Sequence, residues 1–172
     1  MLDPVAITRP AAPADLPAVA AIYAHYVTHT VATFEEIPPT VAQWRQRLDD
    51  LTDRGLPFLV ADQAGEVAGF AYAAPWRPKP AYRHTVEDTI YLAHDRTGRG
   101  LGRRLLAALL AESTRAGMRQ MIAVIADTGR ADSVALHRSL GFTDAGLLIG
   151  VGTKHGRCLD TRLMQRTLRP AQ

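Results

Sequence analysis

The chain has 172 residues, of which 47% are hydrophobic and 22% charged, and its net charge is +3 with a pI near 9.3. This length fits a single domain, and the composition excludes disordered and collagen-like chains. One cysteine, Cys158, excludes an intrachain disulfide and a cysteine-built zinc site, and we find neither a charged leader nor an apolar run of membrane-spanning length. We therefore expect one cytoplasmic domain over residues 1–172, with no metal ion and no membrane partner.

The first half of the chain predicts a strand, two helices and a hairpin. We expect the strand over residues 5–9, a helix opened by Asp15, and a second helix that Thr40 caps and that runs to residue 53 with Trp44 facing inward. Strands over residues 58–62 and 67–74 flank a turn at Gly65 and form an antiparallel hairpin. Residues 75–80 contain three prolines, which argue against a regular element there.

The second half predicts two helices and four strands. The strands cover residues 85–93, 121–126, 142–151 and 158–168, and the helices cover residues 101–116 and 132–140. Together these elements predict an α/β fold of the mixed α+β type. We expect a central, mostly antiparallel twisted sheet of about seven strands with helices on both faces.

A glycine-rich segment, Gly98-Arg99-Gly100-Leu101-Gly102, lies between an apolar strand and an amphipathic helix. Glycines let the backbone approach a ligand, and the following helix contributes unpaired N–H groups, so such a loop binds phosphate oxygens. Arginines gather around it rather than along a basic helix, which favours a compact anion over nucleic acid. The spacing matches neither the dinucleotide fingerprint nor a Walker A loop, so NAD and ATP fit poorly. Alone, the glycines would also fit a simple turn.

In this segment the chain resembles the GCN5-related N-acetyltransferase (GNAT) superfamily, whose acetyl-CoA loop reads Gln/Arg-x-x-Gly-x-Gly/Ala. Thr97 takes the place of the usual Gln or Arg. The resemblance implies that acetyl-CoA is the co-substrate, that the amides of residues 99–104 hold its pyrophosphate, and that Tyr91 and Leu92 pair with its pantetheine arm. The implied cofactor-binding residues are Tyr91, Leu92, Arg99, Gly100, Leu101, Gly102, Arg103, Arg104 and Ser133.

A closer resemblance covers nearly the whole chain. The segments Ala-Pro-Trp-Arg at residues 74–77, Thr-Val-Glu at 85–87, Ser-Val-Ala-Leu-His at 133–137 and Val-Gly-Thr-Lys at 151–154 are similar to the phosphinothricin and methionine sulfone/sulfoximine N-acetyltransferase family. The resemblance implies a GNAT fold, a homodimer, and acetyl transfer to the α-amino group of a small amino-acid analogue.

Two residues are candidates for the chemistry. An α-amino group with a pKa of about 8 is mostly protonated at neutral pH, so acetylation needs a base, and Glu87 is the candidate. The resemblance places His137 near the sulfur of CoA, where it would protonate the thiolate or relay the amine proton. Glu87 could instead be a strand residue paired with an arginine, and His137 a surface or capping residue. Cys158 does not stand at a nucleophile position, so we expect direct transfer in a ternary complex.

The acceptor would lie against the proline-rich loop. Trp76, Arg77 and Tyr82 form one wall, Lys154 could pair with the carboxylate of the substrate, and Phe34 could close the opposite side. Trp76 and Tyr82 could equally be packing residues, and Lys154 a solvated charge. Glu35 and Glu36 follow Phe34 where phosphinothricin-specific members tend to carry an arginine, which favours methionine sulfone or sulfoximine as substrates.

Other functions remain open at this point. The same fold and cofactor could serve a polyamine, an aminoglycoside or a protein N-terminus, and a chain that binds acetyl-CoA without turnover would be a sensor. The high pI also fits a nucleic-acid binder, whose affinity would fall steeply with salt. We expect a small-molecule amine as the partner and no nucleic acid.

Overall fold

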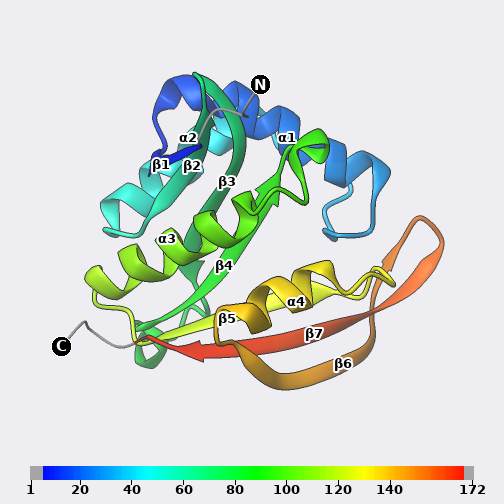
Figure 1. Cartoon of the computed structure of the whole chain (residues 1–172). Coiled ribbons are helices and arrows are strands. Elements are labelled where there is room, and N and C mark those ends of the chain that lie inside the picture. The colour runs from blue at the N-terminus through cyan, green and yellow to red at the C-terminus, as the bar shows by residue number, and fades with distance from the viewer. Residues whose placement is uncertain (1–5, 169–172) are drawn as a thin grey trace.

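The computed structural model describes residues 6–168, which fold into one seven-stranded sheet with helices on both faces (Figure 1). The strand order is β1-β2-β3-β4-β5-β7-β6. The strands are β1 (Ile7–Pro10), β2 (Phe58–Gln63), β3 (Glu66–Pro75), β4 (Thr85–Leu92), β5 (Gln120–Ala126), β6 (Thr143–Lys154) and β7 (Arg157–Thr167). The α-helices are α1 (Leu16–His29), α2 (Val41–Asp53), α3 (Leu101–Arg115) and α4 (Asp132–Ser139), and short 3-10 turns are η1 (Pro13–Asp15), η2 (Pro80–Tyr82) and η3 (His94–Arg96).

The predicted fold class and the order of elements are confirmed, with differences at the ends of elements. The predicted first strand began at Val5, which lies outside the described residues. The prediction that residues 75–80 hold no regular element was wrong at both ends, because Pro75 is the last residue of β3, opposite Val86, and Pro80 opens η2. A proline at the end of a strand gives up only one donor, and its carbonyl can still accept.

The predicted cap of α2 is confirmed. The Thr40 hydroxyl accepts from the Gln43 amide at 3.2 Å, and the Gln43 side chain accepts from the Thr40 amide at 2.8 Å. This reciprocal pair satisfies two of the donors that a helix start leaves open. The cap orients α2 so that Trp44 is buried, and its ring packs edge-on against Tyr23 with 5.4 Å between centroids.

The two faces of β4 look toward different helices. Side chains alternate between faces along a strand. Tyr91 packs against Tyr23 and Tyr26 of α1, so the odd-numbered residues of β4, Glu87 among them, face α1 and α2. Asp88 contacts His137 of α4, so the even-numbered residues face α3 and α4. The strand β4 therefore presents Glu87 on the face of the sheet that α1 and α2 cover, and Asp88 on the face that α3 and α4 cover.

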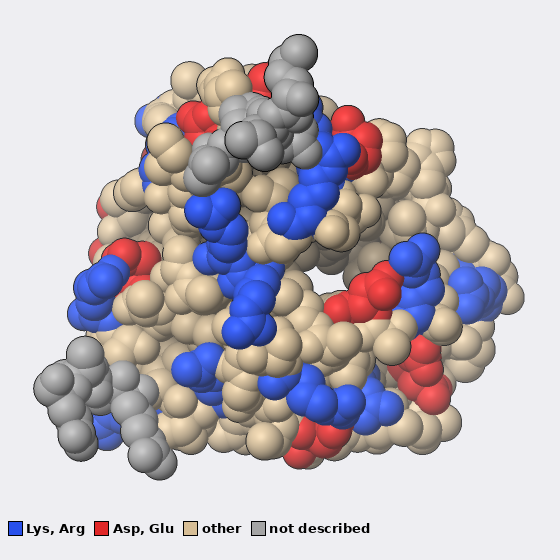
Figure 2. Space-filling view, in the orientation of Figure 1, with Lys and Arg blue, Asp and Glu red and all other residues tan. Residues whose placement is uncertain are grey.

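The centre of the sheet opens between β4 and β5. These strands run parallel but pair over only three positions, from Thr85 opposite Gln120 to Glu87 opposite Ile122. Beyond Glu87 the two strands diverge, β4 staying with β3 and β5 with β7 (Figure 1). Figure 2 shows the surface hollowed between the part that carries α1–α3 and the part that carries α4, β6 and β7, with acidic and basic side chains at the rim. The opening exposes a strand edge whose backbone groups can pair with an extended ligand.

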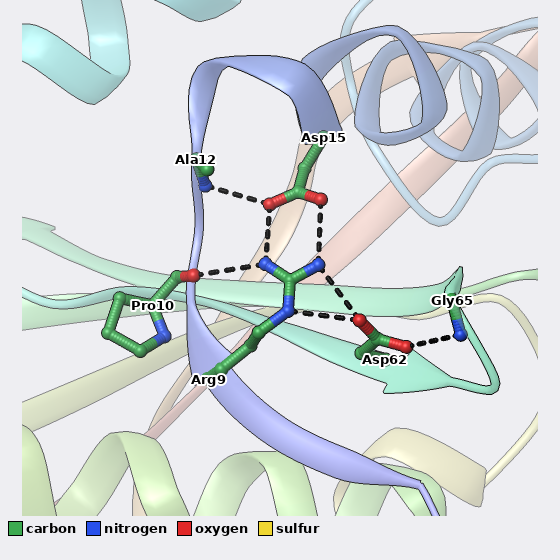
Figure 3. Close-up of polar contacts among 6 residues, drawn as sticks. All are labelled: Arg9, Pro10, Ala12, Asp15, Asp62 and Gly65. Carbon is green, nitrogen blue, oxygen red and sulfur yellow. Dashed lines mark hydrogen bonds and ion pairs between the residues drawn. The ribbon is translucent and has the colours of Figure 1, made fainter.

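A cluster of charged side chains around Arg9 lies at β1 and β2, at the edge of the sheet opposite β6 (Figure 3). The Arg9 guanidinium donates to both oxygens of Asp15 at 2.8 and 2.9 Å and to Asp62 at 3.0 Å. Asp15 also accepts from the Ala12 amide, and Asp62 from the Gly65 amide. The bonds from Arg9 hold the pKa of the Asp15 carboxyl below its usual value. This Arg9 cluster ties β1 to the start of α1 and to the β2–β3 turn.

Candidate active site

The glycine loop ends at the N-terminus of α3. Gly98 and Gly100 have φ angles of 75° and 77°, in the left-handed region that glycine adopts without strain, and Gly100 is the N-cap of α3. A Cβ atom added at Gly100 would meet no heavy atom within 4 Å, so the space above the loop is open. The Arg104 amide donates to the Gly100 carbonyl at 3.2 Å. Arg104 thus begins the helical bonding, and the amides of residues 101–103 before it have no partner within the helix.

Two of the predicted cofactor residues also pack α3 against α4. A Cβ atom added at Gly102 would lie 3.3 Å from a methyl carbon of Leu136, so glycine permits the close approach of the two helices. The Arg103 guanidinium donates to the Ser139 carbonyl at 3.1 Å and to its hydroxyl at 2.8 Å. The position of α4 therefore depends on the helix that carries the glycine loop.

Tyr91 and Leu92 lie on β4 beyond the point where β5 diverges. The Tyr91 ring belongs to the aromatic core, and its hydroxyl donates to the Ala32 carbonyl at 3.4 Å. Burial raises the pKa of Tyr91 far above its usual value. The Leu92 carbonyl accepts from the Tyr26 hydroxyl at 2.6 Å. Since the Tyr91 side chain and the Leu92 carbonyl have protein partners, contacts with a cofactor would come from other backbone groups on the open edge of β4.

Glu87 stands at the last paired position before the opening. Its side chain is half-buried, and within residues 6–168 no donor is bonded to its carboxylate. Burial raises the pKa of Glu87, the negative charge of Asp88 raises it further, and Arg77 partly opposes both. A carboxylate with a raised pKa and no fixed donor is well suited to accept a proton.

His137 is buried and bonded through both ring nitrogens. Nε2 lies 2.8 Å from Oδ2 of Asp88, and Nδ1 lies 2.7 Å from the Ser133 carbonyl oxygen. Burial lowers the pKa of His137, but the hydrogen bond and charge of Asp88 outweigh it and the net pKa is raised. Both ring nitrogens of His137 thus have protein partners, and its predicted role, protonating the CoA thiolate or relaying the amine proton, stays a prediction.

Asp88 was not among the predicted site residues. The sequence carried a signal for it, because Val86, Ile90 and Leu92 share its face of β4, and a carboxylate interrupts this apolar series. Its partner lies 49 residues further along the chain, so no local pattern could identify it.

The loop between β3 and β4 carries the residues predicted for one wall of the acceptor site. The Arg77 guanidinium lies 4.7 Å from the centroid of the Trp76 ring, and the Trp76 amide donates to the Thr85 carbonyl at 3.2 Å. Arg77 is exposed, and Tyr82 is partly exposed in η2 on the same connection. Trp76 and Arg77 thus contact each other, and Trp76 lies two residues beyond Ala74, which pairs with Glu87 in the β3–β4 hairpin.

Lys154 and Phe34 join the loop after α1 to the β6–β7 hairpin. Lys154 is only 2% exposed, and its ammonium donates to the Thr33 carbonyl at 2.8 Å. Burial lowers the pKa of Lys154, against a smaller opposite effect of Glu36 and Glu35. Phe34 packs so closely on Gly152 that a Cβ atom there would lie 2.3 Å from a ring carbon. Lys154 is therefore neither a solvated charge nor freely exposed to a substrate carboxylate.

Comparison with known proteins identifies the family. Residues 19–142 match the Acetyltransferase (GNAT) family. This chain is a GNAT acetyltransferase. It is 49% identical to a phosphinothricin N-acetyltransferase of Alcaligenes faecalis, over 90% of this chain and 78% of that protein. It is 42% identical to an L-methionine sulfoximine/L-methionine sulfone acetyltransferase of Pseudomonas aeruginosa, over 95% of each chain.

A solved structure agrees with the sequence relatives. The crystal structure of a GNAT superfamily phosphinothricin acetyltransferase from Sinorhizobium meliloti, in complex with acetyl-CoA, superposes with a TM-score of 0.91. The sequences are 46% identical, and the alignment covers 95% of this chain and 89% of that one. The predicted resemblance to this family is thus confirmed. Within residues 6–168, no helix of this acetyltransferase is long and apolar enough to cross a membrane.

Proposed function

We propose that this GNAT acetyltransferase transfers the acetyl group of acetyl-CoA to the α-amino group of a small amino-acid analogue. The observation that carries the proposal is the half-buried carboxylate of Glu87, at the position where β4 and β5 part. Relatives named for phosphinothricin and for methionine sulfone and sulfoximine support this acceptor class. The unpaired thiol of Cys158 fits a reducing compartment such as the cytoplasm.

Acetyl-CoA would bind across the opening. Its pyrophosphate fits the open space above Gly100, where first-turn amides and the positive end of α3 favour an anion. Its pantetheine arm would follow the edge of β4 near Tyr91 and Leu92, with Ser133 at the start of α4 on the opposite side. Arg99 and Arg104 add positive charge on either side of Gly100. When bound, acetyl-CoA supplies an activated acetyl group as a thioester.

Glu87 would act as the base. Its raised pKa favours taking a proton from the ammonium form of the acceptor, directly or through water, so that the neutral amine attacks the acetyl carbon. Cys158 lies on the exposed edge hairpin, where its Sγ is 3.7 Å from the Gly150 carbonyl oxygen. We assign Cys158 no covalent role, and the acetyl group would pass directly from acetyl-CoA to the amine within a ternary complex.

We assign the carboxylate of the acceptor to Arg77. Its exposed guanidinium, held on the Trp76 ring, can bind a carboxylate through two N–H groups, with Tyr82 on the same loop. Lys154 would act indirectly, by holding Thr33 and thus Phe34 at the opposite side of the site. Glu35 and Glu36 would repel a phosphinate, which favours methionine sulfone and sulfoximine over phosphinothricin.

An acceptor panel tests the proposal. CoA release would be followed with methionine sulfone, methionine sulfoximine, phosphinothricin, spermidine, an aminoglycoside and a peptide N-terminus. We expect turnover with the sulfone and sulfoximine, and a rise in KM of about 10-fold or more in Arg77→Ala for these substrates, since a charge-assisted bond contributes about 1.5–3 kcal/mol. Binding of acetyl-CoA without CoA release for any amine would contradict the proposal and favour a sensor.

The proposed form is a homodimer. On β6 the side chains of Leu147, Leu148, Ile149 and Val151 are all exposed, Ile149 by 71%, and β6 is an edge strand. A row of exposed apolar residues on an edge strand is typical of a protein interface. Light scattering should give twice the chain mass for the wild type and the chain mass for Ile149→Lys. A monomeric wild type would contradict this part of the proposal.

A further inference from the structure

The buried pair of Asp88 and His137 is not explained by proton transfer to a substrate. The two side chains join β4 to α4 directly after Glu87, the last residue of β4 that pairs with β5. His137 is 2% exposed and Asp88 7%, and Phe142 packs edge-on against the imidazole with 5.0 Å between ring centroids. A charged group so far from water is expected only where a partner compensates its charge.

The bonds define the charge of the imidazole. A carbonyl oxygen only accepts, so Nδ1, facing the Ser133 carbonyl, carries a hydrogen. Nε2 faces the Asp88 carboxylate, where a bare nitrogen lone pair would be repelled, so Nε2 also carries one. Asp88 is the titratable group that faces His137, while Glu87 borders Asp88 from the other face of β4. With Asp88 ionised, the pair is an imidazolium and a carboxylate.

This pair is linked to the donor side of the active site through α4. His137 is held to α4 by the Ser133 carbonyl, and α4 in turn packs Leu136 on Gly102 and receives the Arg103 guanidinium at Ser139. A shift of α4 would therefore move the helix end that follows the glycine loop. The second oxygen of Asp88, Oδ1, is buried without a donor among residues 6–168, so His137 is the bonded partner that balances this charge.

We propose that Asp88 is a positioning residue for acetyl transfer, which keeps His137 doubly protonated and thereby holds α4 against β4 at the opening. The inference rests on the proposed function, since it explains how the acetyl-CoA loop is kept in register with Glu87. In this account His137 moves no proton during the reaction. Its fixed charge anchors α4.

The test combines a spectroscopic and a kinetic measurement. In apo protein labelled with ¹⁵N-histidine, the His137 signals, assigned by their loss in His137→Gln, should report two protonated nitrogens up to pH 8. In Asp88→Asn they should report a neutral ring at that pH. With methionine sulfone, Asp88→Asn should raise the KM for acetyl-CoA and lower kcat/KM by about 10- to 100-fold, because small misplacements near reacting groups have effects of this size. Asp49→Asn, an exposed carboxylate on α2, is the matched control and should change neither.

The outcomes separate the two proposals. A neutral His137 in the wild type at pH 7, an unchanged imidazole in Asp88→Asn, or an unchanged KM for acetyl-CoA would each overturn the inference. The titration uses apo protein, so it remains decisive for the pair even if no amine is acetylated and the proposed function fails. Glu87→Gln should lower kcat by about 100- to 10,000-fold and leave the His137 signals doubly protonated, which distinguishes loss of the base from loss of the anchor.

Discussion

The Arg9 cluster and the group formed by Glu87, Asp88 and His137 use carboxylates in opposite ways. Around Arg9, each oxygen of Asp15 and Asp62 accepts at least one hydrogen bond. In the centre of the sheet, Oδ1 of Asp88 has no donor and the Glu87 carboxylate has none, within residues 6–168. The bonds from Arg9 lower the pKa of Asp15, whereas burial raises the pKa of Glu87, and carboxylates with raised pKa values are candidates for functional sites. We therefore expect substitutions in the Arg9 cluster to change stability and substitutions at Glu87 to change activity.

The largest expected effect is the loss of activity on removal of the Glu87 carboxylate. Glu87→Gln keeps the size of the side chain but removes the base, so kcat should fall by about 100- to 10,000-fold. Because the pKa of Glu87 is raised in the fold, its charged form destabilises the folded protein above pH 4.5. The variant should therefore unfold at a higher temperature than the wild type. Steady-state CoA release and a thermal melt measure both quantities. A normal kcat would remove Glu87 from the mechanism.

The second prediction concerns the Arg9 cluster, where a substitution should lower stability and leave activity unchanged. Asp15→Asn removes the negative charge and one of the two acceptor oxygens that face Arg9, so the free energy of unfolding should fall by about 2–3 kcal/mol. The KM and kcat for methionine sulfone should stay at the wild-type values below the melting transition. A loss of activity in the folded variant would mean that the two regions are coupled.

The Arg9 cluster should also be sensitive to acid. The pKa of Asp15 is lowered in the fold by its bond with Arg9, so its stabilising effect is complete above the ordinary pKa of about 4. The effect is lost as the pH falls through the lowered pKa. The difference in melting temperature between the wild type and Asp15→Asn should therefore shrink below pH 4. A constant difference down to pH 2 would contradict the assigned ion pair.

A smaller effect is expected in the glycine loop. Gly100→Ala forces alanine into the left-handed region, at about 1–2 kcal/mol, without meeting a neighbouring atom. The loop should relax away from this conformation, and the Kd for acetyl-CoA should rise by about 10-fold with little change in the melting temperature. Gly55→Ala is the matched control, because Gly55 also has a positive φ and open space but follows α2, away from the loop. Equal affinity losses in both variants would point to a general effect of strain.

The smallest effect concerns the acceptor side. Gly152→Ala would place a Cβ atom 2.3 Å from the Phe34 ring and displace it. The KM for methionine sulfone should rise a few-fold, while the KM for acetyl-CoA stays unchanged. Phe34→Ala, which removes the ring instead of moving it, is the comparison. A change in the KM for acetyl-CoA alone would contradict the place of Phe34 in the acceptor site.

The sequence predicts the parts of this protein that depend on local signals. The Thr40 cap, the turn at Gly65 and the glycine loop before α3 each follow from residues close together in the chain. The pair of Asp88 and His137 and the bond from Lys154 to Thr33 join residues 49 and 121 positions apart, and no periodicity records them. Family resemblance led to His137 and Lys154 but not to their partners. Those partners are Asp88 for His137 and the Thr33 carbonyl for Lys154, and they are the basis for the positioning roles proposed above.

The most direct test of the account is to identify the product. Acetyl-CoA and methionine sulfone would be incubated with the purified protein, and CoA and the acetylated amine would be quantified together by mass spectrometry. The account predicts N-acetylmethionine sulfone and CoA in equal amounts, at a rate that Glu87→Gln lowers by at least about 100-fold. Release of CoA without an acetylated amine, or equal rates for both proteins, would contradict it.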